Sequence, residues 1–295
     1  MLLQKYFETR LEMIEKALKE YMSFEDPHAK ELKQAMHQAV FSGGKRWRPL
    51  LLVSIFEMLI GMKKSKQLDS VIAAACAVEI MHNAALIHDD MPCVMNKKER
   101  RNSPAIHMQH NNAIAILAGD ALYTLAYKAV ADIKDPEKAV QAVRILSAYT
   151  MSYGLIGGQA VALQNKRKVM KINTLRYIDS KKTGALLQAA ADIACMMAET
   201  DENTRQIMNT YALNLGLAHQ MIDDIAEDYG RGSEGLESDE EFVPSSRSSY
   251  TGLLGFDKAR KTVERMLEDS ERMIKPYAQN DVLIEFIQMI LEKMP

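Results

Sequence analysis

The chain has 295 residues, of which 47% are hydrophobic and 26% charged, and its formal net charge is −2. This length can bury a full hydrophobic core, and the near balance of charges gives no reason to expect binding to nucleic acid or to an anionic membrane. Three cysteines (Cys76, Cys93 and Cys195) stand far apart in apolar surroundings, which favours free buried thiols over disulfides or a zinc site. We therefore expect a reducing, cytoplasmic environment.

Apolar residues recur with helical spacing along the chain, and no segment shows the alternation typical of a strand. Residues 1–21 predict an amphipathic helix with interleaved acids and lysines, unlike a secretory signal peptide. The longest apolar run, Val71 to Val78, is too short to span a bilayer, so we expect no stable membrane insertion. Breaks in the pattern delimit roughly ten to twelve helices in one all-α domain. They lie at 26–27, 61–66, 91–92, 135–136, 199–203 and 230–249.

The segment 79–117 holds the first group of residues suited to chemistry. His82 and Asp89 are two helical turns apart and share a helix face, and Ala85 lies on that face one turn before Asp89. Acids on an apolar helix are costly to bury unless they are paired or bound to a metal. The pair Asp89 and Asp90 therefore predicts either a metal site or a surface pair that caps the helix before Pro92.

A second acidic group favours the metal site. Asp223 and Asp224 end another apolar helical run, and Glu227 lies one turn after Asp223, so that these two carboxylates project together. Carboxylate oxygens bind Mg²⁺, and cationic side chains bind the phosphate oxygens that such a metal also bridges. The sequence offers suitable cations at Lys45, Arg46, Arg48, Arg100 and Arg101.

Seven short motifs follow one another along the chain. They are GGKRWRP at 43–49, the segment 82–90, RRNSPAIH at 100–107, LAGDAL at 117–122, GGQA at 157–160, KKTGAL at 181–186 and HQMIDD at 219–224. In this order and spacing they resemble the trans-isoprenyl diphosphate synthases, the family of farnesyl and geranylgeranyl diphosphate synthases. The resemblance implies a single domain over residues 1–295, an all-α helical bundle around a central deep cavity. It also implies Mg²⁺-dependent, head-to-tail condensation of isopentenyl diphosphate with an allylic diphosphate, in a protein that is usually a dimer.

The resemblance assigns roles to individual residues. The family's site for isopentenyl diphosphate falls on Lys45, Arg48, His82 and Arg101. The other catalytic positions fall on Arg100 and Lys182 for the allylic diphosphate and on Thr183 and Gln220 beside the carbocation. The Mg²⁺ ligands fall on Asp89, Asp90, Asp223, Asp224 and Glu227. We also expect the Lys-Thr-Gly sequence at 182–184 to kink a helix. Arg247 takes the position of the family's last loop lysine, in an acidic loop at 230–249 that we expect to be mobile.

Some residues depart from the family pattern. Met95 replaces the third acid of the first motif and cannot ligate Mg²⁺, and Lys97 and Lys98 replace the acids that usually follow it. In the family, the residues four and five before the first acidic pair set the length of the product. Here they are Ala85 and Ala84, which leave room for geranylgeranyl diphosphate (C20) or a longer product.

Three functions remain open. The chain could be an active prenyl diphosphate synthase of altered efficiency. It could instead be a catalytically weak or silent subunit that pairs with a competent homologue and tunes its product, since the family is usually dimeric. A terpene-cyclase-like enzyme that ionises one diphosphate would explain the changed first motif, but it would not need Lys45, Arg48, His82 and Arg101.

Overall fold

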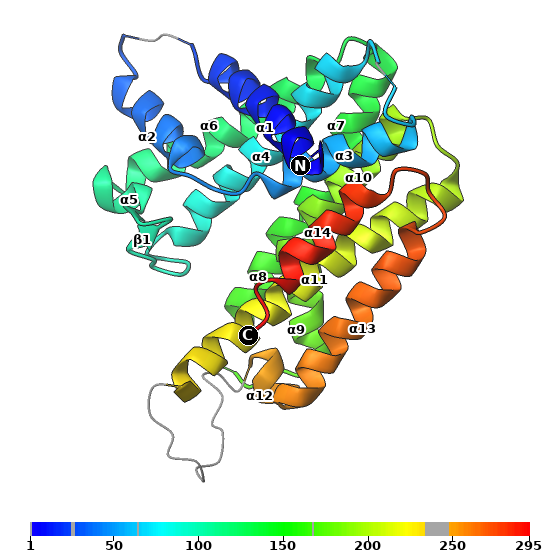
Figure 1. Cartoon of the computed structure of the whole chain (residues 1–295). Coiled ribbons are helices and arrows are strands. Elements are labelled where there is room, and N and C mark those ends of the chain that lie inside the picture. Colours follow the sequence, from blue (N-terminus) through cyan, green and yellow to red (C-terminus); the bar gives the residue numbers. More distant parts are fainter. Residues whose placement is uncertain (1, 25–26, 64, 167, 234–247) are drawn as a thin grey trace. The chain divides into compact units, whose positions relative to one another are not determined.

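The computed structural model describes residues 2–24, 27–63, 65–166, 168–233 and 248–295, and its regular structure is almost entirely helical (Figure 1). Within these residues there are fourteen α-helices, one π-helix and one antiparallel hairpin of two short strands. The predicted all-α class is confirmed. The predicted loop cation Arg247 lies outside the described residues, as does most of the predicted acidic loop. The first residues of that loop, 230–233, belong to a helix.

The elements follow in this order: α1 (Leu2–Tyr21), α2 (Lys30–Phe41), α3 (Trp47–Leu59), α4 (Leu68–Asp90), β1 (Glu99–Arg100), β2 (Ser103–Pro104), α5 (Ile106–Gln109), α6 (Asn112–Ala131), α7 (Pro136–Thr150), α8 (Leu155–Asn165), α9 (Ile172–Asp179), the π-helix η1 (Ser180–Gly184), α10 (Ala185–Met197), α11 (Glu202–Ser233), α12 (Tyr250–Leu254), α13 (Phe256–Ile274) and α14 (Asp281–Leu291).

The helices form two compact units. Unit 1 contains residues 1–56 and 63–144, and unit 2 contains residues 57–62 and 145–295. The first acidic pair (Asp89 and Asp90) belongs to unit 1, and the second acidic cluster (Asp223, Asp224 and Glu227) belongs to unit 2. The prediction of one domain around a central deep cavity stays a prediction.

Helix α4 forms the core of unit 1. Every residue from Ser70 to Met81 is buried, and α4 packs against α1, α2 and α6. Gly119 of α6 lies against the imidazole of His88 in α4, so the glycine of the LAGDAL motif is a point where the two helices touch. The side chain of Asn111 caps α6 by accepting a 2.9 Å hydrogen bond from the backbone N–H of Ile114.

Helices α4 and α6 are long and apolar enough to cross a membrane, judged by length and composition alone. The fold buries 78% of the apolar window in α4 and 39% of that in α6. The longest uninterrupted apolar run did not indicate that either helix is long and apolar enough to span a membrane. Single polar residues such as Glu79 break such a run but barely change the mean hydropathy of a long window. A buried core helix has the same composition as a membrane span, and this accounts for α4.

Helices α10, α13 and α14 pack against α11 in unit 2. A Cβ atom added to Gly216 of α11 would lie 3.1 Å from the Cα of Gly184, so the glycines allow these segments to approach closely. The buried hydroxyl of Tyr211 donates a 2.6 Å hydrogen bond to the carbonyl of Leu283 and fixes α14 on α11. Residues 180–184, which include Lys-Thr-Gly, form the π-helix η1; the kink expected there stays a prediction.

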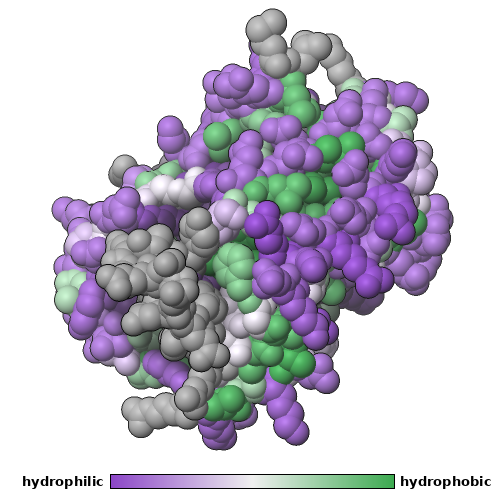
Figure 2. All heavy atoms as spheres, turned by 60° about the horizontal axis from the view of Figure 1, so that its bottom comes forward, coloured by the Kyte–Doolittle hydropathy of each residue, from purple (hydrophilic) through white to green (hydrophobic). Residues whose placement is uncertain are grey.

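The three cysteines are free. Cys76 and Cys195 are buried as predicted, but Cys93 is exposed because it lies in the turn that follows α4. Hydrophilic side chains cover much of the face shown in Figure 2, and apolar side chains gather there in separate patches. Two large apolar side chains of α6, Ile116 and Leu117, are exposed.

Replacing Gly119 by alanine should destabilise unit 1, because the new Cβ would overlap the imidazole of His88. Overpacking of this kind costs about 1–3 kcal/mol, which should lower the urea concentration at the unfolding midpoint. Thr124→Ala, at an exposed position of the same helix, is the control and should change the free energy of unfolding by about 0.5 kcal/mol at most. Equal midpoints for the two variants would contradict the close contact at Gly119.

Candidate functional site

The last two turns of α4 present one partly exposed face. His82, Ala85, Leu86 and Asp89 lie on it at the i, i+3, i+4 and i+7 positions, and each is partly exposed. The predicted shared face of His82, Ala85 and Asp89 is therefore present. Ala84, the other residue predicted to limit product length, is fully buried and lies off this face.

Three of the four residues predicted to bind isopentenyl diphosphate lie near one another in unit 1: two arginines, Arg48 and Arg101, and His82, each of them partly exposed. We call them the cationic group of unit 1. Burial lowers the pKa of the Arg48 guanidinium; the carboxylate of Glu79 opposes this effect, and the charge of Arg101 adds to it. Burial, followed by the charges of Arg48 and Arg101, holds the pKa of His82 well below its ordinary value. The imidazole of His82 is therefore neutral and can donate one hydrogen bond and accept another.

Arg48 lacks a partner at one atom. Its Nε is buried and has no hydrogen-bond partner among the residues that the structure describes. Buried polar atoms are normally satisfied, so this nitrogen marks a position where an anion would fit. Lys45, the fourth predicted residue, is exposed instead, and its ammonium lies 5.6 Å from the centroid of the Trp47 ring.

A buried network that the sequence reasoning missed supports these cations. The guanidinium of Arg46, which is 4% exposed, donates to Glu15 at 2.7 Å and to Glu79 at 2.9 Å. Glu79 also accepts a 3.3 Å hydrogen bond from the side-chain amide of Asn83. The amide oxygen of Asn83 in turn accepts a 3.1 Å bond from Arg101. Glu79 therefore neutralises Arg46 and, through Asn83, helps to hold Arg101.

The sequence contained a signal for this network. Glu79 interrupts a long run of apolar residues, and a carboxylate at such a position must have a buried partner. Arg46 stands between two residues of the predicted diphosphate site, Lys45 and Arg48. The pairing itself joins positions 33 residues apart, and no local pattern indicates it.

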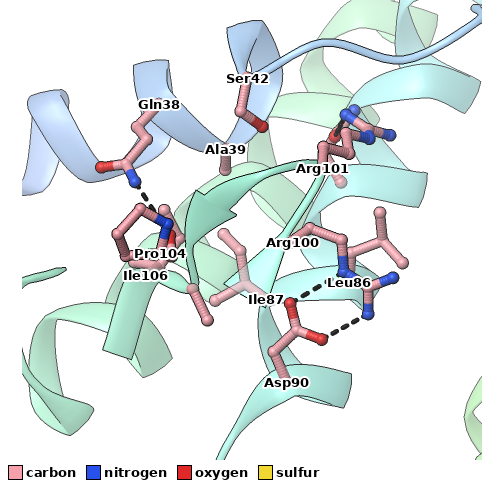
Figure 3. Close-up of a pocket in the computed structure, with 12 residues that line it drawn as sticks. Gln38, Ala39, Ser42, Leu86, Ile87, Asp90, Arg100, Arg101, Pro104 and Ile106 are labelled. Carbon is pink, nitrogen blue, oxygen red and sulfur yellow. Dashed lines mark hydrogen bonds and ion pairs between the residues drawn. The ribbon is translucent and has the colours of Figure 1, made fainter. Parts of the chain in front are cut away.

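Asp90 is engaged by an arginine rather than presented to a metal. The residue is 3% exposed, and both of its carboxylate oxygens accept hydrogen bonds from Arg100, from Nε at 3.0 Å and from Nη2 (Figure 3). A fork of this kind is among the stronger ion-pair geometries. The next residue, Arg101, serves different partners and donates to the carbonyl of Gly43 as well as to Asn83.

A small pocket lies at this junction of α2, α4 and the hairpin (Figure 3). Asn83, Arg100 and Arg101 contribute its polar lining together with Asp90. Arg100 and Arg101, two of the three arginines predicted to bind diphosphates, therefore border one pocket of unit 1 and are held by different partners.

The two acids of the first pair are engaged differently. Both oxygens of Asp90 accept hydrogen bonds from Arg100, whereas Asp89 is partly exposed, and their role as Mg²⁺ ligands stays a prediction. The backbone N–H of Met95 donates a 3.1 Å bond to the backbone carbonyl of Asp89, and the side chain of Met95, where the family has an acid, is 38% exposed. Within the described ranges, no group of three or more His, Cys, Asp and Glu side chains is arranged to hold a metal ion.

The second acidic cluster divides into an outward and an inward side. Asp223 is half exposed, and Glu227, one turn further along α11, is exposed. Asp224 instead accepts a 2.9 Å hydrogen bond from the backbone N–H of Tyr250. Burial raises the pKa of Asp224 to about 6, although the Tyr250 N–H and the Gln220 side chain oppose the rise. Asp223 and Glu227 are therefore the pair that fits Mg²⁺, which commonly takes one or two carboxylates with substrate phosphates and water.

The π-helix η1 positions Lys182 and Thr183 in unit 2. It packs on α8 at Gly158, the second glycine of the GGQ motif. A Cβ atom added to Gly158 would lie 3.1 Å from the backbone nitrogen of Lys182 and still closer to Lys181, so glycine allows the close approach. The predicted residues Lys182, Thr183 and Gln220 thus all belong to unit 2, as does the second acidic cluster.

Asp179, just before η1, is a candidate functional residue that the sequence did not indicate. It is 8% exposed, and burial raises its pKa to about 7. The Tyr250 hydroxyl and the ammonium of Lys182 oppose this rise, and the charge of Asp224 adds to it. No motif indicated Asp179, because its environment is created by residues from three other helical segments.

Comparisons with known proteins identify the class of protein to which this arrangement belongs. An FPP/GFPP synthase from Zymomonas mobilis has the same fold, with a TM-score of 0.84, 26% sequence identity and coverage of 98% of both chains. The fold is therefore that of the isoprenyl diphosphate synthases. The family model for polyprenyl synthetases matches residues 29–236, and the chain belongs to this family.

Two curated relatives come from Arabidopsis thaliana. Geranylgeranyl pyrophosphate synthase 3, chloroplastic, is 32% identical over 251 residues, which cover 82% of this chain and 68% of the relative. Large subunit 1 of a heterodimeric geranylgeranyl pyrophosphate synthase, also chloroplastic, is 29% identical over 285 residues, which cover 94% of this chain and 75% of the relative.

Replacing Glu79 by glutamine should lower the free energy of unfolding strongly, because the buried guanidinium of Arg46 would lose its buried counter-charge. Removing one partner of a buried ion pair costs about 3–5 kcal/mol. Glu15→Gln is the matched control: it removes the other carboxylate on Arg46, but that side chain is 31% exposed and should cost about 1 kcal/mol or less. Urea unfolding measures both, and similar losses for the two variants would contradict the role given to Glu79.

Replacing Asp179 by asparagine should stabilise the chain above neutral pH. The pKa of Asp179 is raised from its ordinary 3.8 to about 7, so the folded state favours the protonated acid. The stability from this group is fully present below about pH 4 and is lost as the pH rises through 7. Asparagine cannot ionise, so the advantage of the variant should grow between these values to the order of a few kcal/mol and then level off. A difference in unfolding free energy that does not depend on pH would contradict the assignment.

Proposed function

We propose that the chain is a prenyltransferase that condenses isopentenyl diphosphate head-to-tail with an allylic diphosphate to give a trans-prenyl diphosphate. Membership of the polyprenyl synthetase family supports this function. The observation that carries it is the buried Nε of Arg48, which lacks a hydrogen-bond partner within the described residues and lies near Arg101 and a neutral His82. Arginines with unsatisfied N–H groups bind a diphosphate through charge-assisted hydrogen bonds.

In the proposed reaction the allylic C–O bond breaks, the double bond of isopentenyl diphosphate forms the new C–C bond, and a proton leaves to the released diphosphate. No side-chain nucleophile or base is required. Arg48, His82 and Arg101 orient isopentenyl diphosphate. Asp223 and Glu227 hold Mg²⁺, which when bound stabilises negative charge on the leaving diphosphate.

The remaining predicted residues act on the allylic substrate. Arg100 uses two of its five N–H groups on Asp90 and presents the others to the allylic diphosphate. Lys182 donates to the same diphosphate, and the oxygens of Thr183 and Gln220 face the developing carbocation. These side chains do the work of positioning and charge stabilisation.

The product is proposed to be geranylgeranyl diphosphate or longer. Ala85 lies on the partly exposed face of α4, one turn before Asp89, and its methyl group leaves room for a growing tail. A 32% identical relative is named a geranylgeranyl pyrophosphate synthase, which agrees with this length.

A second candidate function is that of a subunit that pairs with a competent homologue and adjusts its product. Two observations favour it: Arg100 engages Asp90 while Met95 replaces the third acid, and one relative is the large subunit of a heterodimeric synthase.

The exposed Ile116 (46%) and Leu117 (52%) of α6 offer an apolar contact surface for a second chain. We propose a cytoplasmic homodimer through this surface, with the heteromer as the alternative.

A terpene-cyclase-like reaction is the third candidate. A single-substrate enzyme has no use for a second diphosphate site, so the cationic group of Arg48, His82 and Arg101 weighs against it.

Purified protein with Mg²⁺, isopentenyl diphosphate and dimethylallyl, geranyl or farnesyl diphosphate distinguishes these functions. An extended prenyl diphosphate from the protein alone supports the synthase. A product that forms only when a homologous chain is added supports the subunit. A hydrocarbon or alcohol formed without isopentenyl diphosphate supports the cyclase and refutes the proposed condensation.

Replacing Ala85 by phenylalanine should shorten the main product, because the ring would block the path of the growing tail beside Asp89. Chromatography of the hydrolysed products measures chain length. Ala131→Phe adds the same ring at an exposed position of α6 and should leave the product unchanged. The same chain length for Ala85→Phe and the unmodified protein would refute the assignment of Ala85.

Replacing Met95 by aspartate should increase Mg²⁺-dependent turnover, because it restores an acid in the turn whose backbone bonds to that of Asp89. Turnover and metal affinity are measured together. Met108→Asp makes the same change at a methionine that is 48% exposed and should have no effect. If Met95→Asp alters neither quantity, the account of the first acidic pair fails.

A further inference from the structure

Helix α14 brings the segment after it to the second acidic cluster. The helix packs against α11 (Figure 1), where the Tyr211 hydroxyl bonds to Leu283 and where Phe286 and Ile290 are buried. Lys293 follows the helix by two residues, and its backbone N–H still bonds to the carbonyl of Ile290 at 3.2 Å. The position of Lys293 is thus set by packing within unit 2.

Two contacts connect Lys293 to an acid of the cluster. The ammonium nitrogen of Lys293 lies 2.6 Å from Nε2 of His219. On the other side of the ring, Nδ1 of His219 lies 3.1 Å from Oδ2 of Asp223, one turn further along α11. Lys293, His219 and Asp223 therefore form a continuous chain of polar contacts.

These contacts determine which ring nitrogen carries the proton. An ammonium group has three donors and no acceptor, so Nε2 of His219 must accept the bond from Lys293 and carries no proton. A neutral imidazole then has its proton on Nδ1, where it is donated to Oδ2 of Asp223. The direction of both hydrogen bonds follows from the chemistry of lysine.

We propose that Lys293 is a positioning residue for the divalent cation held by Asp223 and Glu227. It acts through His219: the selected tautomer holds Oδ2 of Asp223 and leaves the other oxygen, Oδ1, to the cation. Without Lys293 the imidazole proton can move to Nε2, and the lone pair of Nδ1 then repels the carboxylate. This inference rests on the proposed function, since the cation is the Mg²⁺ of prenyl transfer.

The affinity for Mn²⁺ alone, measured by electron paramagnetic resonance, tests the proposal. Lys293→Met should weaken Mn²⁺ binding by roughly tenfold or more, as is typical when the partner of a metal ligand is lost. Simple electrostatics predicts the opposite sign, because the variant removes a positive charge near a cation. Tighter or unchanged binding in Lys293→Met would therefore overturn the positioning role.

Two further variants separate position from charge. Lys293→Arg keeps a side chain that only donates and should retain most of the Mn²⁺ affinity. Lys275→Met removes the same charge at an exposed position of unit 2 and should bind Mn²⁺ as the unmodified protein does. Equal weakening in Lys275→Met and Lys293→Met would also contradict the proposal.

Nitrogen-15 NMR of His219 gives a measurement that does not depend on enzymatic activity. The unmodified protein should show the Nδ1–H tautomer, and Lys293→Met should shift the ring toward Nε2–H. An Nε2–H tautomer in the unmodified protein would refute the inference even if the chain is an active synthase. The expected tautomer and Mn²⁺ response in a protein without prenyl transfer would support the positioning role and refute the proposed function instead.

Discussion

The ion pair between Arg46 and Glu79 is the interaction on which the cationic group of unit 1 depends. Both residues are almost fully buried, and a charge held away from water must be neutralised nearby. Glu79 meets that requirement for Arg46 and reaches Arg101 through Asn83. Arg48 is left with a buried nitrogen that the described residues do not satisfy. The chain thus supplies internal counter-charge for one arginine and leaves another for an anionic ligand.

Helix geometry explains why adjacent carboxylates have different surroundings. Neighbouring residues on a helix point about 100° apart, so two acids in sequence cannot both face the same way. Asp89 lies on the partly exposed face of α4, whereas Asp90 turns inward and pairs with Arg100. In α11, Asp223 is half exposed, and Asp224 turns inward to the backbone of Tyr250. Doubled acids in a helical motif should therefore be treated as two residues with separate roles.

Features that depend on spacing along one helix were predictable from the sequence. The helical class and the shared face of His82, Ala85 and Asp89 are of this kind. Features that depend on contacts between distant segments were not: these include the pair of Arg46 with Glu79, the engagement of Asp90, and the burial of Asp179. The prediction that Cys93 is buried was wrong, because its apolar sequence neighbours lie in an exposed turn that follows α4.

The two acidic groups of this chain differ in how strongly their surroundings prepare them for a cation. At the first pair, Arg100 neutralises Asp90 and Met95 adds no oxygen ligand, so the local chemistry favours direct contact between arginine and phosphate. At the second cluster, Nδ1 of His219 lies 3.1 Å from Oδ2 of Asp223, and Lys293 contacts the other ring nitrogen at 2.6 Å. A carboxylate held in this way loses less freedom when a metal binds. At the first motif, Met95 and the pairing of Asp90 with Arg100 therefore leave fewer carboxylate oxygens open, whereas Asp223 and Glu227 are exposed at the second cluster.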